Sequence, residues 1–307
     1  MNELPPFFEN KNFFFKIVFL LFFVVLGTLL FSLGGVALSK LIWHDAYDAL
    51  SVAQQADYVR FNQAISMLGV WLVPALLFSY GHYRNLWRYN RADQPVSAVL
   101  LKWTCLLAIV LLPVVYFLSY LNQQVQLPDF MSGIEEWMRA KETKAEDLLT
   151  MLTDDTSVPV LCLNLLVMGV MPAVCEEFFF QGTLQPLLMR SMRNNHMAIW
   201  LTAFIFSVIH FQFYGFIPRL LLGAYLGYLF VWSGSLWLPI VAHMLHNVCS
   251  LLLQFAADRQ GVDTEDPSTF ADQLPTIIPI VVAASVVVGY GIYKLWKNRI
   301  QESELTD

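Results

Sequence analysis

The chain has 307 residues, of which 57% are hydrophobic and only 14% are charged. Soluble domains are about half apolar and about a quarter charged, so this composition is typical of a polytopic membrane protein. The net charge of −6 comes from acids in a few loops. Because no basic surface suited to a nucleic acid is present, we exclude nucleic acid as a partner.

The first apolar run spans 17–38 and follows Lys11 and Lys16. A signal peptide has a shorter apolar core, of roughly 7–15 residues. We therefore predict a retained first membrane helix rather than a cleaved leader.

Apolar stretches of about 20 residues are long enough to span a bilayer, and they predict an all-α polytopic bundle of about eight transmembrane helices. They lie at about 15–38, 63–81, 97–121, 158–180, 197–213, 216–232, 236–256 and 275–295. We divide the chain into membrane helices within 1–157, a core at 158–256, and a part at 257–307 that holds a loop, the last helix and a tail.

Basic residues predict the orientation, since Lys and Arg are enriched in cytoplasmic loops. They gather before the first helix, at 84–91, at 190–193 and at 294–299, whereas the alternate loops at 129–155 and 258–272 are acidic. We therefore expect the basic side, with both termini, to be cytoplasmic.

The segment 134–152 has apolar residues at helical spacing and predicts an amphipathic helix. We interpret it as an extracytoplasmic lid that packs on the helix ends, with a substrate-binding role as the alternative.

Four cysteines, Cys105, Cys162, Cys175 and Cys249, lie in apolar segments without a CxxC pair. We interpret all of them as small buried hydrophobic residues. Cys175 adjoins Glu176, but neighbouring helical residues point about 100° apart, so we do not assign it as a nucleophile.

Five polar residues stand out inside three of the apolar segments: Glu176, Glu177, His210, His243 and Asn247. Ionisable groups at membrane depth are costly and mark functional sites by default. Glu176 lies fourteen residues before Arg190, about 21 Å along an unbroken helix. His210 lies fourteen residues after His196, again about 21 Å. We therefore expect these groups to share one layer of the membrane.

Spacing also indicates which side chains share a helix face. His243 and Asn247 are four residues apart, as are Phe206 and His210, so the Phe206 ring is expected to pack on the His210 imidazole. Glu177 and Gln181 likewise share a face. Glu176 points elsewhere, which predicts different roles for the two glutamates.

Two chemistries suit these groups. In one, Glu176 takes a proton from a water that His210 helps to orient, while His243 and Asn247 donate hydrogen bonds to the oxyanion. In the other, Glu176, His210 and His243 hold Zn²⁺ with an open position for water. The His-Glu-x-x-His signature of soluble zinc proteases is absent, and the residue types leave both possibilities, no cofactor or Zn²⁺, open.

Three segments together resemble the motifs of a known family. Residues 176–182 (EEFFFQG) resemble Glu-Glu-x-x-x-Arg, 206–210 (FSVIH) resemble Phe-x-x-x-His, and 243–247 (HMLHN) resemble His-x-x-x-Asn. The family is the CPBP group of type II CAAX prenyl endopeptidases and bacteriocin-processing or self-immunity (Abi) proteins. The resemblance covers about 158–255.

The resemblance implies an intramembrane endopeptidase in the plasma (inner) membrane of a bacterium. It implies that Glu176 is the water-activating base with His210 as its partner, and that His243 and Asn247 form the oxyanion hole. Its substrates would be membrane-tethered peptides, either CAAX-type or bacteriocin-like, and membrane lipids would surround it.

One position departs from the family pattern, because Gln181 replaces the arginine. A glutamine can hydrogen-bond Glu177 but cannot balance its charge, so Glu177 is expected either to be protonated or to pair with Arg219. The departure supports an alternative function, a catalytically degraded membrane binding or immunity protein. A proton-coupled transporter is the third hypothesis, but the chain lacks the paired halves of transporters.

Overall fold

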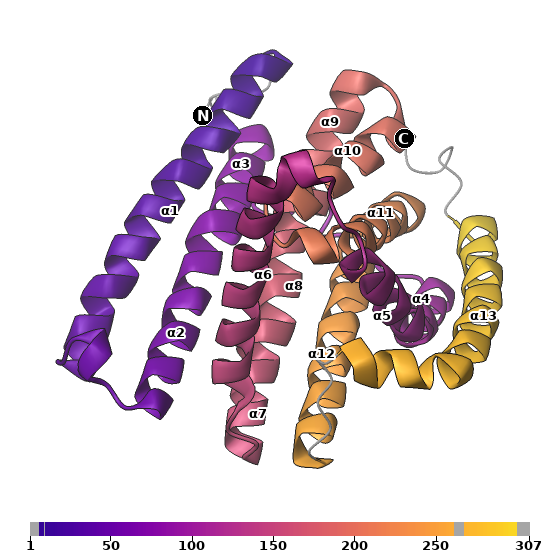
Figure 1. The fold of residues 1–307 in the computed structure, drawn as a ribbon. Helices are drawn as coiled ribbons and strands as arrows, with labels where there is room; N and C mark the ends of the chain where they lie inside the picture. The colour runs from indigo at the N-terminus through magenta and orange to yellow at the C-terminus, as the bar shows by residue number, and fades with distance from the viewer. Residues whose placement is uncertain (1–5, 9, 261–266, 300–307) are drawn as a thin grey trace.

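The computed structural model describes residues 6–8, 10–260 and 267–299, and the chain is a bundle of α-helices throughout (Figure 1). No strand occurs in these described ranges. The predicted all-α membrane bundle is therefore confirmed. Residues 261–266 of the predicted acidic loop, and the tail from 300 onward, lie outside the described residues.

The first half of the chain supplies three apolar spans and the amphipathic segment. Its helices are α1 (Phe13–Trp43), α2 (Val52–Met67), α3 (Val73–Tyr83), α4 (Ala98–Val110), α5 (Leu112–Gln123) and α6 (Ser132–Thr153). α2 continues into α3 through a π-helical segment, Leu68–Leu72. α4 and α5 form a pair bent by 42°, at a break followed by Pro113.

The second half holds the segment in which the polar groups lie. Its helices are α7 (Val158–Asn164), α8 (Met171–Phe179), α9 (Gln185–Met192), α10 (Asn195–Val208), α11 (Phe216–Ser233), α12 (Trp237–Gln260) and α13 (Pro267–Lys297). π-Helical segments join α7 to α8 (Leu165–Val170, η4) and α8 to α9 (Phe180–Leu184, η5). Figure 1 shows that α13 is bent, and Pro275 and Pro279 lie inside it.

The structure refines the predicted number of spans. Among the described residues, six helices are long and apolar enough to cross a membrane, and the number is seven when the bent α4–α5 pair is counted as one span. The remaining predicted helix corresponds to α10, which has only 14 residues. It ends at Val208 rather than near 213 and packs closely against α11, so the prediction of about eight helices remains close to the structure.

Prolines explain where the long spans deviate from α-helix. Each of the three π-helical segments is followed within two residues by a proline: Pro74, Pro172 or Pro186. A proline has no N–H to donate to the carbonyl four residues back, and its ring clashes with that carbonyl. A local π-turn accommodates the change without ending the span.

An aromatic core fixes the helices around α8. Phe178 and Phe180 are buried there together with Phe78 from α3, Phe206 from α10 and Phe230 from α11. The rings of Phe180 and Phe206 meet edge to face at 5.1 Å. This packing, rather than any single hydrogen bond, sets the position of the glutamates relative to the other helices.

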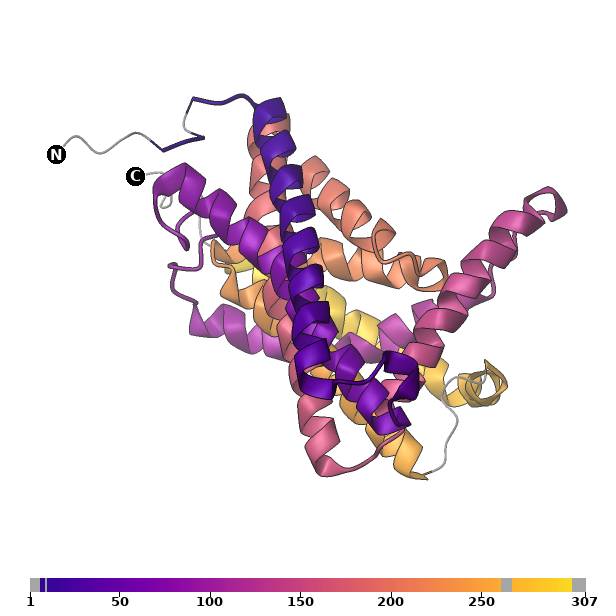
Figure 2. The same cartoon turned by 90° about the vertical axis from the view of Figure 1, so that its left-hand side faces the viewer.

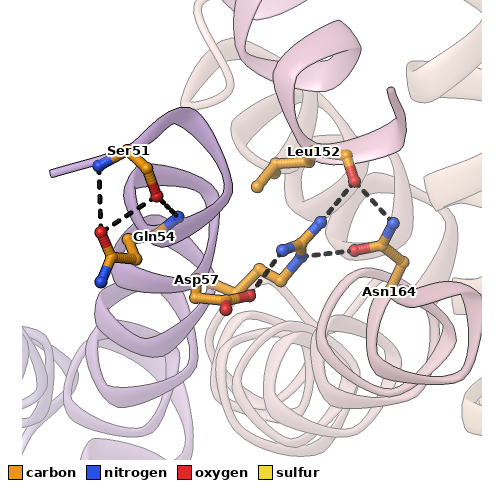
Figure 3. A network of polar contacts seen from close by, with 6 residues as sticks. Ser51, Gln54, Asp57, Leu152 and Asn164 are labelled. Carbon is orange, nitrogen blue, oxygen red and sulfur yellow. Dashed lines mark hydrogen bonds and ion pairs between the residues drawn. The ribbon is translucent and has the colours of Figure 1, made fainter. Parts of the chain in front are cut away.

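α6 occupies the segment for which an amphipathic helix was predicted. Figure 2 shows that it lies outside the bundle of apolar helices, on one side. Arg60 of α2, which is only 4% exposed, holds the C-terminal end of α6 by hydrogen bonds. Arg60 donates to Leu152 O at 2.6 Å, to Asn164 Oδ1 at 2.7 Å and to Asp57 Oδ1 at 2.8 Å. Figure 3 shows this network joining α2, α6 and α7.

The four cysteines are free thiols, as predicted, but they are not all buried. Cys175 is buried and Cys105 and Cys249 are partly buried, whereas Cys162 is exposed on α7. The prediction for Cys162 was wrong because an apolar run does not show which helix face points out of the bundle.

Candidate active site

Glu176 and Glu177 lie near the end of α8, directly before the π-helical segment η5. α8 packs against α12, which carries His243. His243 Nδ1 lies 2.8 Å from Glu177 Oε1, and both side chains are almost completely buried. The two residues are 66 positions apart in the sequence, so packing alone brings them together.

The two carboxylates have different surroundings. Glu177 is fully buried, whereas Glu176 is 8% exposed. In the described part of the chain, the Glu176 carboxylate has no hydrogen-bond partner, although it interacts electrostatically with His243, Glu177 and Arg219. Glu176 is thus the carboxylate with oxygens available to a water or a substrate.

His210 lies in the turn after α10 rather than on the helix, since α10 ends at Val208. Its Nδ1 is 2.6 Å from the carbonyl oxygen of Phe206. A carbonyl only accepts, so Nδ1 carries the proton and Nε2 retains a lone pair. The next residue, Phe211, has a φ of 53°, a strained conformation of the kind that gathers at functional sites.

Phe206 separates and orients the two histidines. Its ring centroid lies 4.8 Å from that of His210 and 6.1 Å from that of His243. The predicted packing of Phe206 on His210 is therefore confirmed. The contact with His243 was not foreseen, because it joins α10 to α12.

Asn247 lies one turn after His243 on α12 and is partly buried. Its carboxamide makes no hydrogen bond to any residue that the structure describes. The structure thus gathers Glu176, Glu177, His210 and His243, and it leaves the Asn247 amide available on the same helix as His243.

Gln181 and Arg219 were the expected partners of Glu177, but each of them makes other contacts. Gln181 is buried and lies near α11, where a Cβ added at Gly227 would be 3.5 Å from Gln181 Oε1. Arg219 donates to Gln212 O at 3.2 Å and to Gln212 Oε1 at 2.9 Å. Within the described residues, Glu177 is bonded by neither of them, and its Oε2 has no partner.

The turn after His210 is covered by α6. The ring centroids of Trp137 and Phe213 are 5.3 Å apart, and the Arg139 guanidinium lies 4.9 Å from the Tyr214 ring. Glu142 of α6 interacts with the backbone of Tyr214, and burial raises the pKa of Glu142. α6 is therefore a cover over the segment that connects His210 to Arg219.

A buried asparagine from a distant loop supports the π-helical segment. Asn90 donates to Phe178 O at 3.2 Å and to Thr183 Oγ1 at 2.8 Å, and Thr183 itself donates to Phe178 O. The side chains of Asn90 and Thr183 thus both donate to the carbonyl of Phe178, the residue after Glu177. Sequence reasoning missed Asn90, because an asparagine in a polar loop carries no signal of a contact 88 residues away.

The metal hypothesis required Glu176, His210 and His243 to surround one ion. In the described portion of the chain, no three His, Cys, Asp or Glu side chains are grouped so that they could hold a metal ion. The arrangement therefore does not fit the Zn²⁺ site, and we derive no step through a metal.

Comparison with known proteins finds a family match for this region. Residues 158–249 match the family described as Type II CAAX prenyl endopeptidase Rce1-like. This match confirms the resemblance predicted from the three motifs, all of which lie inside it. The uncharacterized protein YpbD of Bacillus subtilis (strain 168) is 30% identical over 86 residues, which are 27% of this chain and 41% of that relative. The chain thus matches less than half of the relative's length. No solved structure matches it.

Proposed function

We propose that the chain is an intramembrane endopeptidase whose core is the Rce1-like segment at 158–249. One observation carries the proposal. A carboxylate without a hydrogen-bond partner among the described residues, Glu176, lies beside a buried Glu177–His243 pair within the segment that matches an endopeptidase family.

In the proposed reaction, Glu176 takes a proton from a water molecule. His210 Nε2, which retains its lone pair, accepts the second hydrogen bond of that water and fixes its position. The water oxygen attacks the carbonyl carbon of the peptide bond. When the carbon–nitrogen bond breaks, Glu176 returns its proton to the leaving amine.

His243 and Asn247 stabilise the charge that forms on the carbonyl oxygen. Glu177 accepts the Nδ1 hydrogen bond of His243 and thereby directs Nε2 toward the substrate. There the doubly protonated His243 ring donates from Nε2 together with the Asn247 amide. Glu177 is a positioning residue in this scheme. Phe206 has the same kind of role, because it contacts both imidazoles.

The proposed substrates are membrane-tethered peptides of the CAAX type or bacteriocin-like peptides. A site built between apolar helices suits a chain held at the membrane by a lipid or an apolar segment. The proposed location is the plasma membrane of a bacterium, with both termini cytoplasmic as the basic loops predict.

The alternative function is a membrane binding or immunity protein of the same fold. One observation favours it: Gln181 replaces the family arginine and turns toward α11 instead of Glu177. Such a protein would retain the peptide without hydrolysing it.

The two functions are separated by cleavage of a membrane-peptide library with the purified full chain in nanodiscs. Wild type is compared with Glu176→Gln and with Glu146→Gln, an exposed glutamate of α6 that serves as a charge-matched control. Each protein is assayed with and without a zinc chelator.

We expect cleavage by wild type and Glu146→Gln, no cleavage by Glu176→Gln, and no effect of the chelator. Equal cleavage by Glu176→Gln would overturn the assigned base, and loss with the chelator would favour a metal site. Retention of peptides without cleavage by folded wild type would favour the binding function.

A further inference from the structure

A cavity of about 280 Å³ lies outside the candidate active site, between the loop after α3 and the ends of α9 and α11. A single water needs only about 15 Å³ of such space, so the cavity has room for a small ligand. Six polar side chains line it: Tyr83, Arg88, Tyr89, Arg91, Gln94 and Arg190.

Two of the lining arginines present positive charge that no acid among the described residues neutralises. The Arg88 guanidinium lies 5.3 Å from the Tyr83 ring, and that of Arg190 lies 4.7 Å from the Tyr89 ring. In the described part of the chain, neither arginine forms an ion pair. Lys16 lies within electrostatic range of Arg190 and increases the positive potential.

Tyr89 supplies an independent indication of a ligand. It is only 2% exposed, and its hydroxyl has no hydrogen-bond partner among the described residues. A buried hydroxyl without a partner is destabilising. Burial also raises the pKa of Tyr89, which keeps the hydroxyl protonated.

The loop that carries most of these residues is held in place by the membrane helices. Asn90 bonds to α8 and η5, Trp237 Nε1 of α12 donates to Ala92 O at 2.9 Å, and Ser235 Oγ donates to Gln94 O at 3.1 Å. The cavity is therefore formed in advance, which lowers the entropic cost of binding.

The surroundings place the cavity at the level of lipid headgroups. Tyr80, three residues before Tyr83, and Trp87, next to Arg88, are 45% and 48% exposed. Exposed Tyr and Trp are enriched at the membrane–water interface. Arginine binds phosphate oxygens through paired N–H donors, and basic pockets between membrane helices accept phosphate-bearing headgroups.

We infer that this cavity, which Tyr89 helps to line, binds a phosphate-bearing anion through Arg88 and Arg190. The phosphate comes from the headgroup of an anionic phospholipid or from free phosphate in solution. The site does not depend on the proposed protease activity. Because its loop bonds to the helix of Glu176 and Glu177, the bound anion stabilises the framework of the candidate active site.

The test measures thermal unfolding of the full chain in nanodiscs by tryptophan fluorescence. One arm compares phosphatidylcholine with a mixture of phosphatidylcholine and phosphatidylglycerol. A second arm adds sodium phosphate or sodium chloride, at equal ionic strength, to phosphatidylcholine nanodiscs. Arg88→Gln and Arg190→Gln are compared with Arg193→Gln, a matched control that is exposed at the end of α9 and does not line the cavity.

We expect phosphatidylglycerol to raise the Tm of wild type and of Arg193→Gln. Arg88→Gln and Arg190→Gln should each weaken the apparent affinity by about fivefold, as expected for the loss of one basic contact at a membrane surface. A rise with sodium phosphate as well would support the site and identify free phosphate as a sufficient ligand. No rise with either ligand, or an equal rise in all variants, would overturn the inference.

Discussion

Glu177 uses one carboxylate oxygen to accept from His243, and its other oxygen has no partner in the described part of the chain. If Glu177 orients His243, Glu177→Gln should lower kcat by about 100-fold or more, the scale of a general acid–base contribution. KM should change little, because Glu177 is fully buried and does not face the substrate. Steady-state kinetics on a cleaved peptide measures kcat and KM separately. A rise in KM at constant kcat would contradict the prediction.

Gln181 offers a second test at the residue scale. Gln181→Arg restores the family residue, and its guanidinium can pair with Glu177 Oε2, so we expect the variant to fold and retain activity. The same change in a Glu177→Gln background would bury an unpaired charge, which destabilises by about 3–5 kcal/mol. Thermal unfolding of both proteins checks the pairing. Equal loss of stability in the two backgrounds would show that the introduced guanidinium does not reach Glu177.

At the scale of elements, Arg60 connects α2 to the end of α6 and to α7. Arg60→Met would leave Asn164 Oδ1 without its donor in a buried position. We expect a loss of about 3 kcal/mol and faster proteolysis of the α6–α7 connection. Asp57→Asn is the control, since Asp57 is about half exposed and its ion pair should contribute less than about 1 kcal/mol. Equal effects of the two variants would contradict the role of Arg60.

α6 should respond to pH through Glu142. Burial raises the pKa of Glu142 above its ordinary value of 4.5, and the neighbouring Glu146 acts in the same direction. The ionised carboxylate is therefore disfavoured in the docked state, so docking is strongest below pH 4.5 and weakens as pH rises through the raised pKa. Glu142→Gln should remove this dependence and slow hydrogen exchange of α6 at neutral pH. Hydrogen exchange at acidic and neutral pH checks the effect, which would be contradicted by identical profiles.

The sequence predicted the order and type of the elements more fully than the details of the candidate site. Apolar length alone placed each of the eight helical stretches. It did not show that α10 ends at Val208, because Phe211 adopts a positive φ in a turn without a glycine. It also did not give the Glu177–His243 bond, since helical spacing relates residues on one helix and this bond joins α8 to α12.

At the scale of the whole molecule, the basic loop after α3 and the basic end of α9 meet at one end of the bundle. Arg190 of α9 donates to Tyr83 Oη at the end of α3, and the arginines after α3 share a cavity with it. Figure 1 shows the α1–α2 connection at the opposite end of the bundle from the α9–α10 turn. The arrangement agrees with the predicted clustering of basic loops on one side, and the cytoplasmic assignment of that side stays a prediction.

Cysteine labelling in intact cells tests that assignment. Ser191→Cys lies on an exposed position of α9 and Asp48→Cys in the α1–α2 connection, each in a chain whose four native cysteines are replaced by alanine. We expect a membrane-impermeant maleimide to label Asp48→Cys from outside and to label Ser191→Cys only after the cells are permeabilised. The reverse pattern would place the basic end outside, against the retention of Lys and Arg in the cytoplasm. The phosphate-binding cavity would then lie at the outer leaflet, and the phospholipid that it binds would have to be present in that leaflet.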